Sequence, residues 1–143
     1  MTKKRRILAV DFGDRRTGVA GTDGTGTIVV PLPTLHGLAD AACAKAIAAT
    51  ALDRGSEVIV VGLPLDARSE LGARARRTLG FVEVLRAVAP CPVETFDETH
   101  TTDEAHAMLK DAGLKAARRR QLADSVAAMV ICQRFKAFGG SGS

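Results

Sequence analysis

Short runs of apolar residues alternate along this chain with longer segments whose apolar residues recur at helical spacing. The first run, Ile7–Val10, ends at Asp11 and predicts a strand buried on both faces. Residues 17–22 and 27–32 predict two further strands, joined by an Asp-Gly turn. These three strands predict an antiparallel meander, and Pro31 places the third strand near an edge.

The rest of the chain alternates between helical and strand patterns. The strand–helix–strand order after the meander is typical of parallel strands joined by crossover helices. A Thr-Thr-Asp-Glu sequence beginning at Thr101 predicts a capped helix start, and Gly55 predicts a helix end. The expected helices span residues 38–54, 71–88, 101–111 and 118–135, and the expected strands span residues 57–61 and 93–96.

This order, β-β-β-α-β-α-β-α-α, predicts an α/β fold with a five-stranded mixed sheet and helices on both faces. It is the order of a ribonuclease H-like fold. We expect a single domain over residues 1–138, followed by a flexible Gly- and Ser-rich tail over residues 139–143.

The charge distribution indicates a polyanionic partner. The chain has a net charge of +4, and its basic residues cluster, as at Arg118–Arg120. An aromatic fraction of 3% leaves few stacking platforms, so phosphate contacts would dominate binding to nucleic acid. No apolar run approaches the roughly 18 residues that span a bilayer, so we expect no membrane association and a cytoplasmic location. The three scattered cysteines argue against a disulfide framework or a thiolate zinc site.

Acidic residues stand where such a sheet would bring its elements together. Asp11 ends the first strand, Asp97 and Glu98 end the fifth, and Asp124 lies among alanines in the last helix. Converging carboxylates with oxygen ligands alone suit Mg²⁺ or Mn²⁺. Two such ions would activate a water molecule and stabilise the leaving oxygen of a phosphodiester. The acids therefore predict a two-metal phosphodiesterase site.

Each acid also fits a structural role when it is taken alone. Asp11 could cap the following turn, Asp97 and Glu98 could lie in the first turn of a helix, and Asp124 could pair with a preceding arginine. Their joint position at the ends of elements of one fold favours the metal site. For the substrate phosphates, the candidates are Arg15, Arg16, Arg118, Arg119, Arg120 and His100, whereas the arginines within 71–88 fit either a solvated face or a phosphate-binding stripe.

Four blocks of sequence resemble the YqgF/RuvX family of Holliday junction resolvases, also described as pre-16S rRNA nucleases. They are residues Asp11–Ala20, Val60–Pro64, Asp97–Ala105 and Asp124–Ala128. The resemblance implies a ribonuclease H-like, divalent-metal phosphodiesterase in which Asp11, Glu98 and Asp124 bind metal and Asp97 is a fourth candidate. It also implies that the block around Gly62 forms a loop beside the phosphate path.

One position departs from the family pattern. The family usually has Arg after the Asp-Glu pair, and this chain has Thr99. If that Arg holds a phosphate, its role is vacant here or passes to Arg15, Arg16 or His100.

The resemblance implies a nuclease that processes pre-16S rRNA ends during ribosome biogenesis. The alternatives are a resolvase that acts on branched DNA and a non-catalytic RNA- or ribosome-binding protein. An ATPase or kinase would need a second domain to close over its nucleotide, which 143 residues do not supply. The sequence shows no helix with surplus apolar surface that would form a strong dimer interface, so we expect a monomer or weak homodimer. Because a resolvase must be a dimer to cut two strands symmetrically, this expectation favours RNA as the substrate. The sequence leaves open the substrate, the cleavage mode and position, the metal preference, the oligomeric state and the effect of Thr99.

Overall fold

The computed structural model describes residues 5–64, 72–97 and 116–139, with side chains excepted at 116–124 and 138–139. The expected helix at 101–111, together with Glu98 and His100, lies outside the described residues. The elements are β1 (Ile7–Asp11), β2 (Arg16–Thr22), β3 (Val29–His36), α1 (Asp40–Arg54), β4 (Val58–Leu63), α2 (Ala73–Arg86), β5 (Val93–Asp97), α4 (Ala116–Arg134) and a π-helical turn, η1 (Phe135–Gly139).

The five strands form one mixed sheet in the order β3-β2-β1-β4-β5. β1 pairs with β2 and β2 with β3 in antiparallel fashion, whereas β1 with β4 and β4 with β5 are parallel. This topology confirms the predicted meander followed by crossover connections. β3 is an edge strand, as Pro31 predicts.

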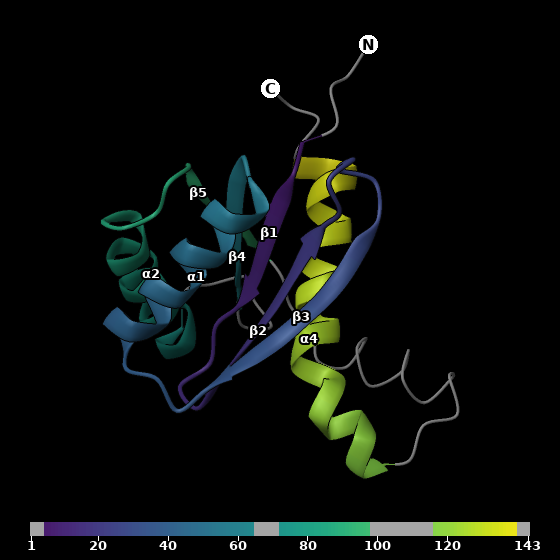
Figure 1. The fold of residues 1–143 in the computed structure, drawn as a ribbon. Coiled ribbons are helices and arrows are strands. Elements are labelled where there is room, and N and C mark those ends of the chain that lie inside the picture. Colours follow the sequence, from purple (N-terminus) through teal and green to yellow (C-terminus); the bar gives the residue numbers. More distant parts are fainter. Residues whose placement is uncertain (1–4, 65–71, 98–115, 140–143) are drawn as a thin grey trace.

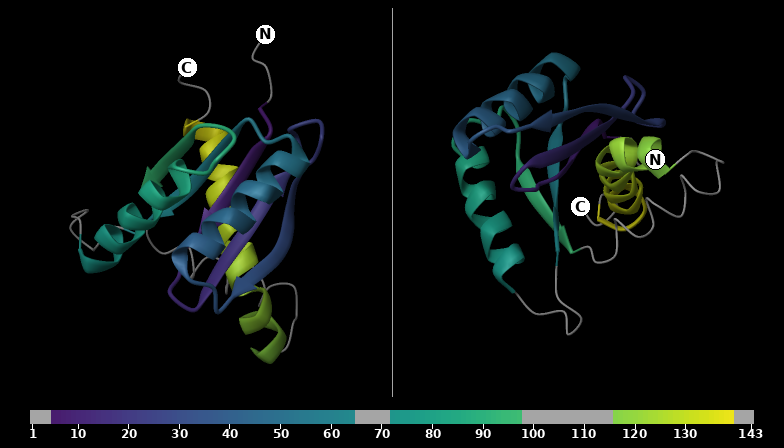
Figure 2. Two further views of the ribbon diagram at one scale, coloured as in Figure 1. Left: turned by 60° about the vertical axis from the view of Figure 1, so that its left-hand side comes forward. Right: turned by 90° about the horizontal axis from the view of Figure 1, so that it is seen from below.

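Helices cover both faces of the sheet (Figures 1 and 2). α1 and α2 lie side by side on one face, which we call the α2 face, and α4 crosses β1, β2 and β3 on the other, the α4 face. Each face has its own buried apolar cluster, with Leu8 and Val10 on the α2 face and Ile7 and Ala9 on the α4 face. β1 is therefore buried on both sides, as its unbroken apolar run predicts.

Local sequence explains the first helix well. α1 is rich in alanine, the best helix former, and buries Cys43, Ala44, Ile47 and Ala51. It ends at Gly55, whose φ of 66° is left-handed and whose N–H bonds back to the last turn. Among the described residues, no helix is long and apolar enough to cross a membrane.

Two strands extend by two or more residues beyond their predicted ends. β3 continues to His36 because Leu35 and His36 pair with the start of β2 beyond an irregularity opposite Gly18. β4 includes Gly62 and Leu63, both buried, which pair with Phe96 and Asp97 of β5. The expectation that Gly62 and Leu63 form a loop is therefore wrong, because both residues continue β4 and pair with β5.

Candidate active site at the edge of the sheet

Asp11 is the last residue of β1, at the edge where the parallel strands β1, β4 and β5 all end. Val10 pairs with Val61, so Asp11 lies beside Gly62 of β4. Its neighbours Ile7–Val10 are buried, whereas Asp11 itself is partly exposed. The strand therefore brings a carboxylate from the core to a solvent-accessible edge, where oxygen ligands can reach an ion.

The alternation of side chains along β1 assigns Asp11 to the α4 face. Ile7 and Ala9 belong to the apolar cluster of that face, and Asp11 follows at the same two-residue period. Phe12 instead joins the cluster of the α2 face. The carboxylate and the ring that follows it therefore point to opposite sides of the sheet.

Asp97 lies on the other face from Asp11. In β5, Phe96 packs with the α4-face cluster and Val93 with the α2-face cluster, so Asp97 shares the face of Val93. The described part of β5 thus does not bring Asp97 to the Asp11 side. The sequence alone leaves the choice between Asp97 and Glu98 open because the face of this strand depends on packing.

α4 carries Asp124 across the Asp11 face. Ser125 Oγ lies 3.0 Å from the carbonyl oxygen of Leu32 in β3. Leu32 pairs with Val19, which pairs with Val10, so Ser125 is level with the end of β1. Asp124 directly precedes Ser125, although its side chain lies outside the described part of the structure.

The described residues alone do not complete a metal site. Within 5–64, 72–97 and 125–137, no three His, Cys, Asp or Glu side chains are grouped to hold an ion. Glu98 and the side chain of Asp124, which would supply the other ligands, lie outside these ranges. The donor chemistry fits a hard divalent cation, because the three candidates offer carboxylate oxygens only.

Gly62 allows α4 to approach the sheet closely beside Asp11. A Cβ at this position would lie 2.5 Å from Cδ1 of Ile131, which is itself buried. Any larger residue at position 62 would therefore force the side chain of Ile131 to move. The close contact fixes the distance between the helix that carries Asp124 and the strands that end at the candidate site.

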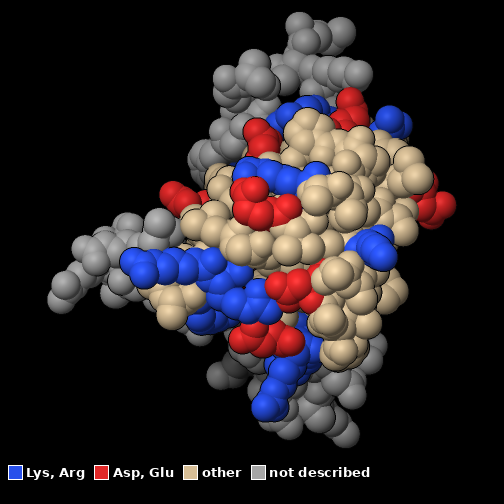
Figure 3. Space-filling model, turned by 90° about the vertical axis from the view of Figure 1, so that its left-hand side faces the viewer, with Lys and Arg blue, Asp and Glu red and all other residues tan. Residues whose placement is uncertain are grey.

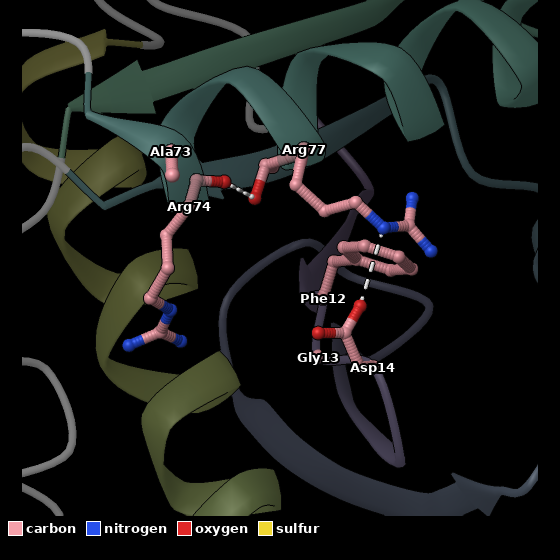
Figure 4. Close-up of a pocket in the computed structure, with 7 residues that line it drawn as sticks. Phe12, Gly13, Asp14, Ala73, Arg74 and Arg77 are labelled. Carbon is pink, nitrogen blue, oxygen red and sulfur yellow. Dashed lines mark hydrogen bonds and ion pairs between the residues drawn. The ribbon is translucent and has the colours of Figure 1, made fainter.

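On the α2 face, a cleft of about 360 Å³ lies between the β1–β2 turn and the first turns of α2. Figure 4 shows the guanidinium of Arg77 over Phe12 and directed toward Asp14, while the side chain of Arg74 extends away from it. The cleft is lined by Phe12, Gly13, Asp14, Ala73, Arg74, Arg77 and Thr78.

Arg77 is held by carboxylates from two other segments. It donates to both oxygens of Asp40 at 2.8 and 2.7 Å, and its Nε lies 3.2 Å from Asp14. Hydrogen bonds from Arg77 lower the pKa of Asp40, and the same bonds raise the pKa of Arg77. In the sequence, Arg77 is only one of several basic residues of a predicted helix, because its two partners are distant along the chain.

Basic side chains are available near this edge of the sheet. Figure 3 shows Lys and Arg gathered on the lower part of the face formed by α1 and α2, interspersed with acidic side chains. Arg74 forms no ion pair with any residue that the structure describes. Arg15 and Arg16 are exposed, and alternation along β2 places Arg16 on the Asp11 side. The side chains of Arg118–Arg120 and His100 lie outside the described part.

A five-stranded mixed sheet with this strand order, an acid at the end of its first strand and helices on both faces defines a ribonuclease H-like protein. The RuvX family, described as Holliday junction resolvase, matches residues 5–136. The chain belongs to this family.

Relatives and solved structures agree with this assignment. The chain is 40% identical over 132 residues to a Chloroflexus aggregans protein named "Putative pre-16S rRNA nuclease", covering 92% of this chain and 93% of the relative. A Roseiflexus protein of the same name is 36% identical, with 91% and 92% covered.

Two solved structures share the fold. Thermus thermophilus RuvC in complex with a Holliday junction substrate has a TM-score of 0.58 at 15% identity, covering 95% of this chain and 97% of that one. Fowlpox virus resolvase in complex with Holliday junction DNA has a TM-score of 0.57 at 9% identity, with 92% and 97% covered.

Proposed function

We propose that this protein is a divalent-metal-dependent nuclease that hydrolyses phosphodiester bonds of pre-16S rRNA in the cytoplasm during ribosome biogenesis. The observation that carries the proposal is the position of Asp11, which ends a buried strand and points to the face crossed by α4. Relatives that match nearly the whole chain at 36–40% identity are named as pre-16S rRNA nucleases, which supports this substrate.

In this proposal, the site binds two divalent ions, Mg²⁺ or Mn²⁺. Their ligands are Asp11, Glu98 and Asp124. Strand alternation favours Glu98 over Asp97, because Asp97 shares the face opposite to Asp11. In the sequence, Asp124 stands four residues before Ala128 and seven before Ile131, both of which are buried, and this helical spacing supports its choice as a ligand.

When bound, the ions would supply an activated water and stabilise the leaving oxygen. The chain itself supplies the acidic ligands and the basic contacts that hold the substrate backbone. Arg16 lies on the Asp11 side of β2 and is a candidate for a phosphate next to the cleaved bond. Arg74 lines the cleft on the α2 face and is a candidate for a phosphate farther along the substrate backbone. Arg15, His100 and Arg118–Arg120 are further candidates for this role.

The second candidate function is resolution of a Holliday junction. The family description and the two junction-bound structures with this fold favour it. A resolvase cuts two strands related by symmetry, so it requires a dimer that presents two sites. We propose instead a monomer or weak homodimer acting on RNA.

The test offers labelled pre-16S rRNA, single-stranded RNA and a four-way DNA junction to the full-length protein with Mn²⁺ or Mg²⁺. Asp11→Asn is compared with Asp53→Asn, which makes the same chemical change at an exposed position of α1. We expect RNA cleavage to be lost in Asp11→Asn and retained in Asp53→Asn. Asp97→Asn should lose less activity than Asp11→Asn.

The outcomes separate the candidates. Cleavage that survives Asp11→Asn would overturn the metal-site assignment. Paired, symmetric cuts in the junction without cleavage of RNA would replace the rRNA proposal by the resolvase. Binding of RNA without cleavage of any substrate would indicate a non-catalytic RNA-binding protein.

A further inference from the structure

Arg77 uses all three nitrogen atoms of its guanidinium to join separate segments. Its two terminal nitrogens bond to Asp40 in the first turn of α1, and Nε pairs with Asp14 in the β1–β2 turn. The guanidinium carbon also lies 4.9 Å from the centre of the Phe12 ring. A planar group held by three polar contacts and one ring contact has little freedom to rotate.

The segment held by Arg77 is the one that immediately follows Asp11. Phe12 stacks on Phe81 of α2, with ring centres 4.1 Å apart and planes 9° apart. The backbone of the turn is also closely packed against itself, because a Cβ on Gly13 would collide with the backbone oxygen of Arg16. The residues on the C-terminal side of Asp11 are therefore fixed to α2 by a ring stack and an arginine.

Arg77 does not act on Asp11 by direct contact. Phe12 and Arg77 lie on the α2 face, whereas Asp11 points to the α4 face. Fixing the ring of Phe12 and the carboxylate of Asp14 sets the backbone direction at Asp11, and so the direction of its side chain. β1 secures the preceding residues, and Arg77 secures the following ones.

We propose that Arg77 is a positioning residue for Asp11, which orients the carboxylate for a divalent cation from the opposite face of the sheet. The inference rests on the proposed function, because it needs Asp11 to be a ligand. Metal ligands must be held to within about 0.5 Å, and loss of a group that orients a ligand typically weakens metal binding about 10- to 100-fold.

The test measures Mn²⁺ binding by calorimetry and RNA cleavage for Arg77→Met and Arg77→Lys. The control is Arg86→Met at the far end of α2, where Arg86 pairs with Glu83 and donates to the carbonyl oxygen of Val93. Both Met variants remove one positive charge, which by simple electrostatics would strengthen cation binding. Weaker binding in Arg77→Met alone therefore has to come from geometry.

For Arg77→Met we expect Mn²⁺ affinity to fall about 10-fold or more, kcat to fall and KM for RNA to stay within about twofold. Amide hydrogen exchange should become faster at Phe12–Arg15. Arg77→Lys keeps the positive charge but cannot form the paired hydrogen bonds to Asp40, so it should not restore Mn²⁺ affinity. Arg86→Met should lower the melting temperature while leaving Mn²⁺ affinity unchanged.

Unchanged Mn²⁺ affinity and kcat in both Arg77 variants, with both lost in Asp11→Asn, would overturn this inference and leave the proposed function intact. Mn²⁺ binding and cleavage that also survive Asp11→Asn would instead overturn the proposed site. If Arg77→Met does not fold, Arg77→Lys decides the question. Equal loss of affinity in Arg77→Met and Arg86→Met would show a general effect of destabilisation and would also overturn the inference.

Discussion

Ser125 in α4 donates a hydrogen bond to the backbone carbonyl of Leu32 in β3 over 3.0 Å. A hydroxyl has one hydrogen, so Thr34, whose Oγ1 is also 3.0 Å from Ser125 Oγ, must be the donor in their contact. The two bonds join the helix that carries Asp124 to the edge strand, at the level where β1 ends. They fix the position of α4 along the sheet.

Ser125→Ala should lower the free energy of unfolding by about 1–3 kcal/mol, because it removes a buried partner from Leu32 and Thr34. Alanine is the better helix former by about 0.5 kcal/mol, so a net loss has to come from the missing bonds. Urea denaturation measures the change. Thr34→Val, which removes one bond, should cost less, and equal stability of Ser125→Ala and the parent would contradict this role.

Gly62→Ala should destabilise the protein by about 1–3 kcal/mol, because the new Cβ would lie 2.5 Å from Cδ1 of Ile131. Ile131→Val removes that Cδ1 atom and alone should cost about 0.5–1.5 kcal/mol. In the double variant we expect the two losses to be less than additive. Thermal denaturation of all four proteins gives the coupling, and strictly additive losses would show that the two side chains do not compete for space.

Asp40→Asn should lower stability by about 0.5–1 kcal/mol near neutral pH, since its partner Arg77 is partly exposed. The pKa of Asp40 is lowered in the folded protein, so its contribution is complete above the unfolded value of about 3.9. It is lost as pH falls through the lower folded-state pKa. Urea midpoints of parent and variant should therefore differ at pH 6 and converge in strong acid; a constant difference would contradict the ion pair.

Arg74→Ala should weaken binding of single-stranded RNA and reduce the slope of log K against log salt by about 1, as expected for one lost phosphate contact. Fluorescence anisotropy in EDTA measures binding without cleavage. Arg76→Ala is the matched control, because it removes the same charge from the same helix but does not line the cleft. Similar slopes for the two variants would indicate a general charge effect.

The order of elements could be predicted because each rests on a local pattern, such as the four apolar residues that precede Asp11. The predicted ends of strands differ from the observed ones where pairing between distant segments determines how far a strand extends. The apolar run of β3 ends at Leu32, yet the strand reaches His36 because β2 offers partners at Arg16 and Thr17. The sequence predicts a loop at Gly62, but in the structure the absence of a side chain there leaves room for Ile131 to pack closely.

The candidate site could be predicted in part. The sequence places Asp11 and Asp97 after strands, but not on a face, since the face depends on which helix covers each side. Arg77 could not be recognised, because its partners Asp14 and Asp40 come from other segments and meet it only in the folded chain. The choice of Glu98 and Asp124 as ligands remains a prediction.

The two prolines of β3 have a consequence for association. Pro31 and Pro33 lack an N–H, and both stand in the edge strand of the sheet. Prolines in sheets are confined to edge strands and bulges, because they donate no hydrogen bond to a neighbouring strand. A foreign strand aligned along β3 would find neither donor there, so this border is a poor template for cross-β aggregation even when the protein is concentrated.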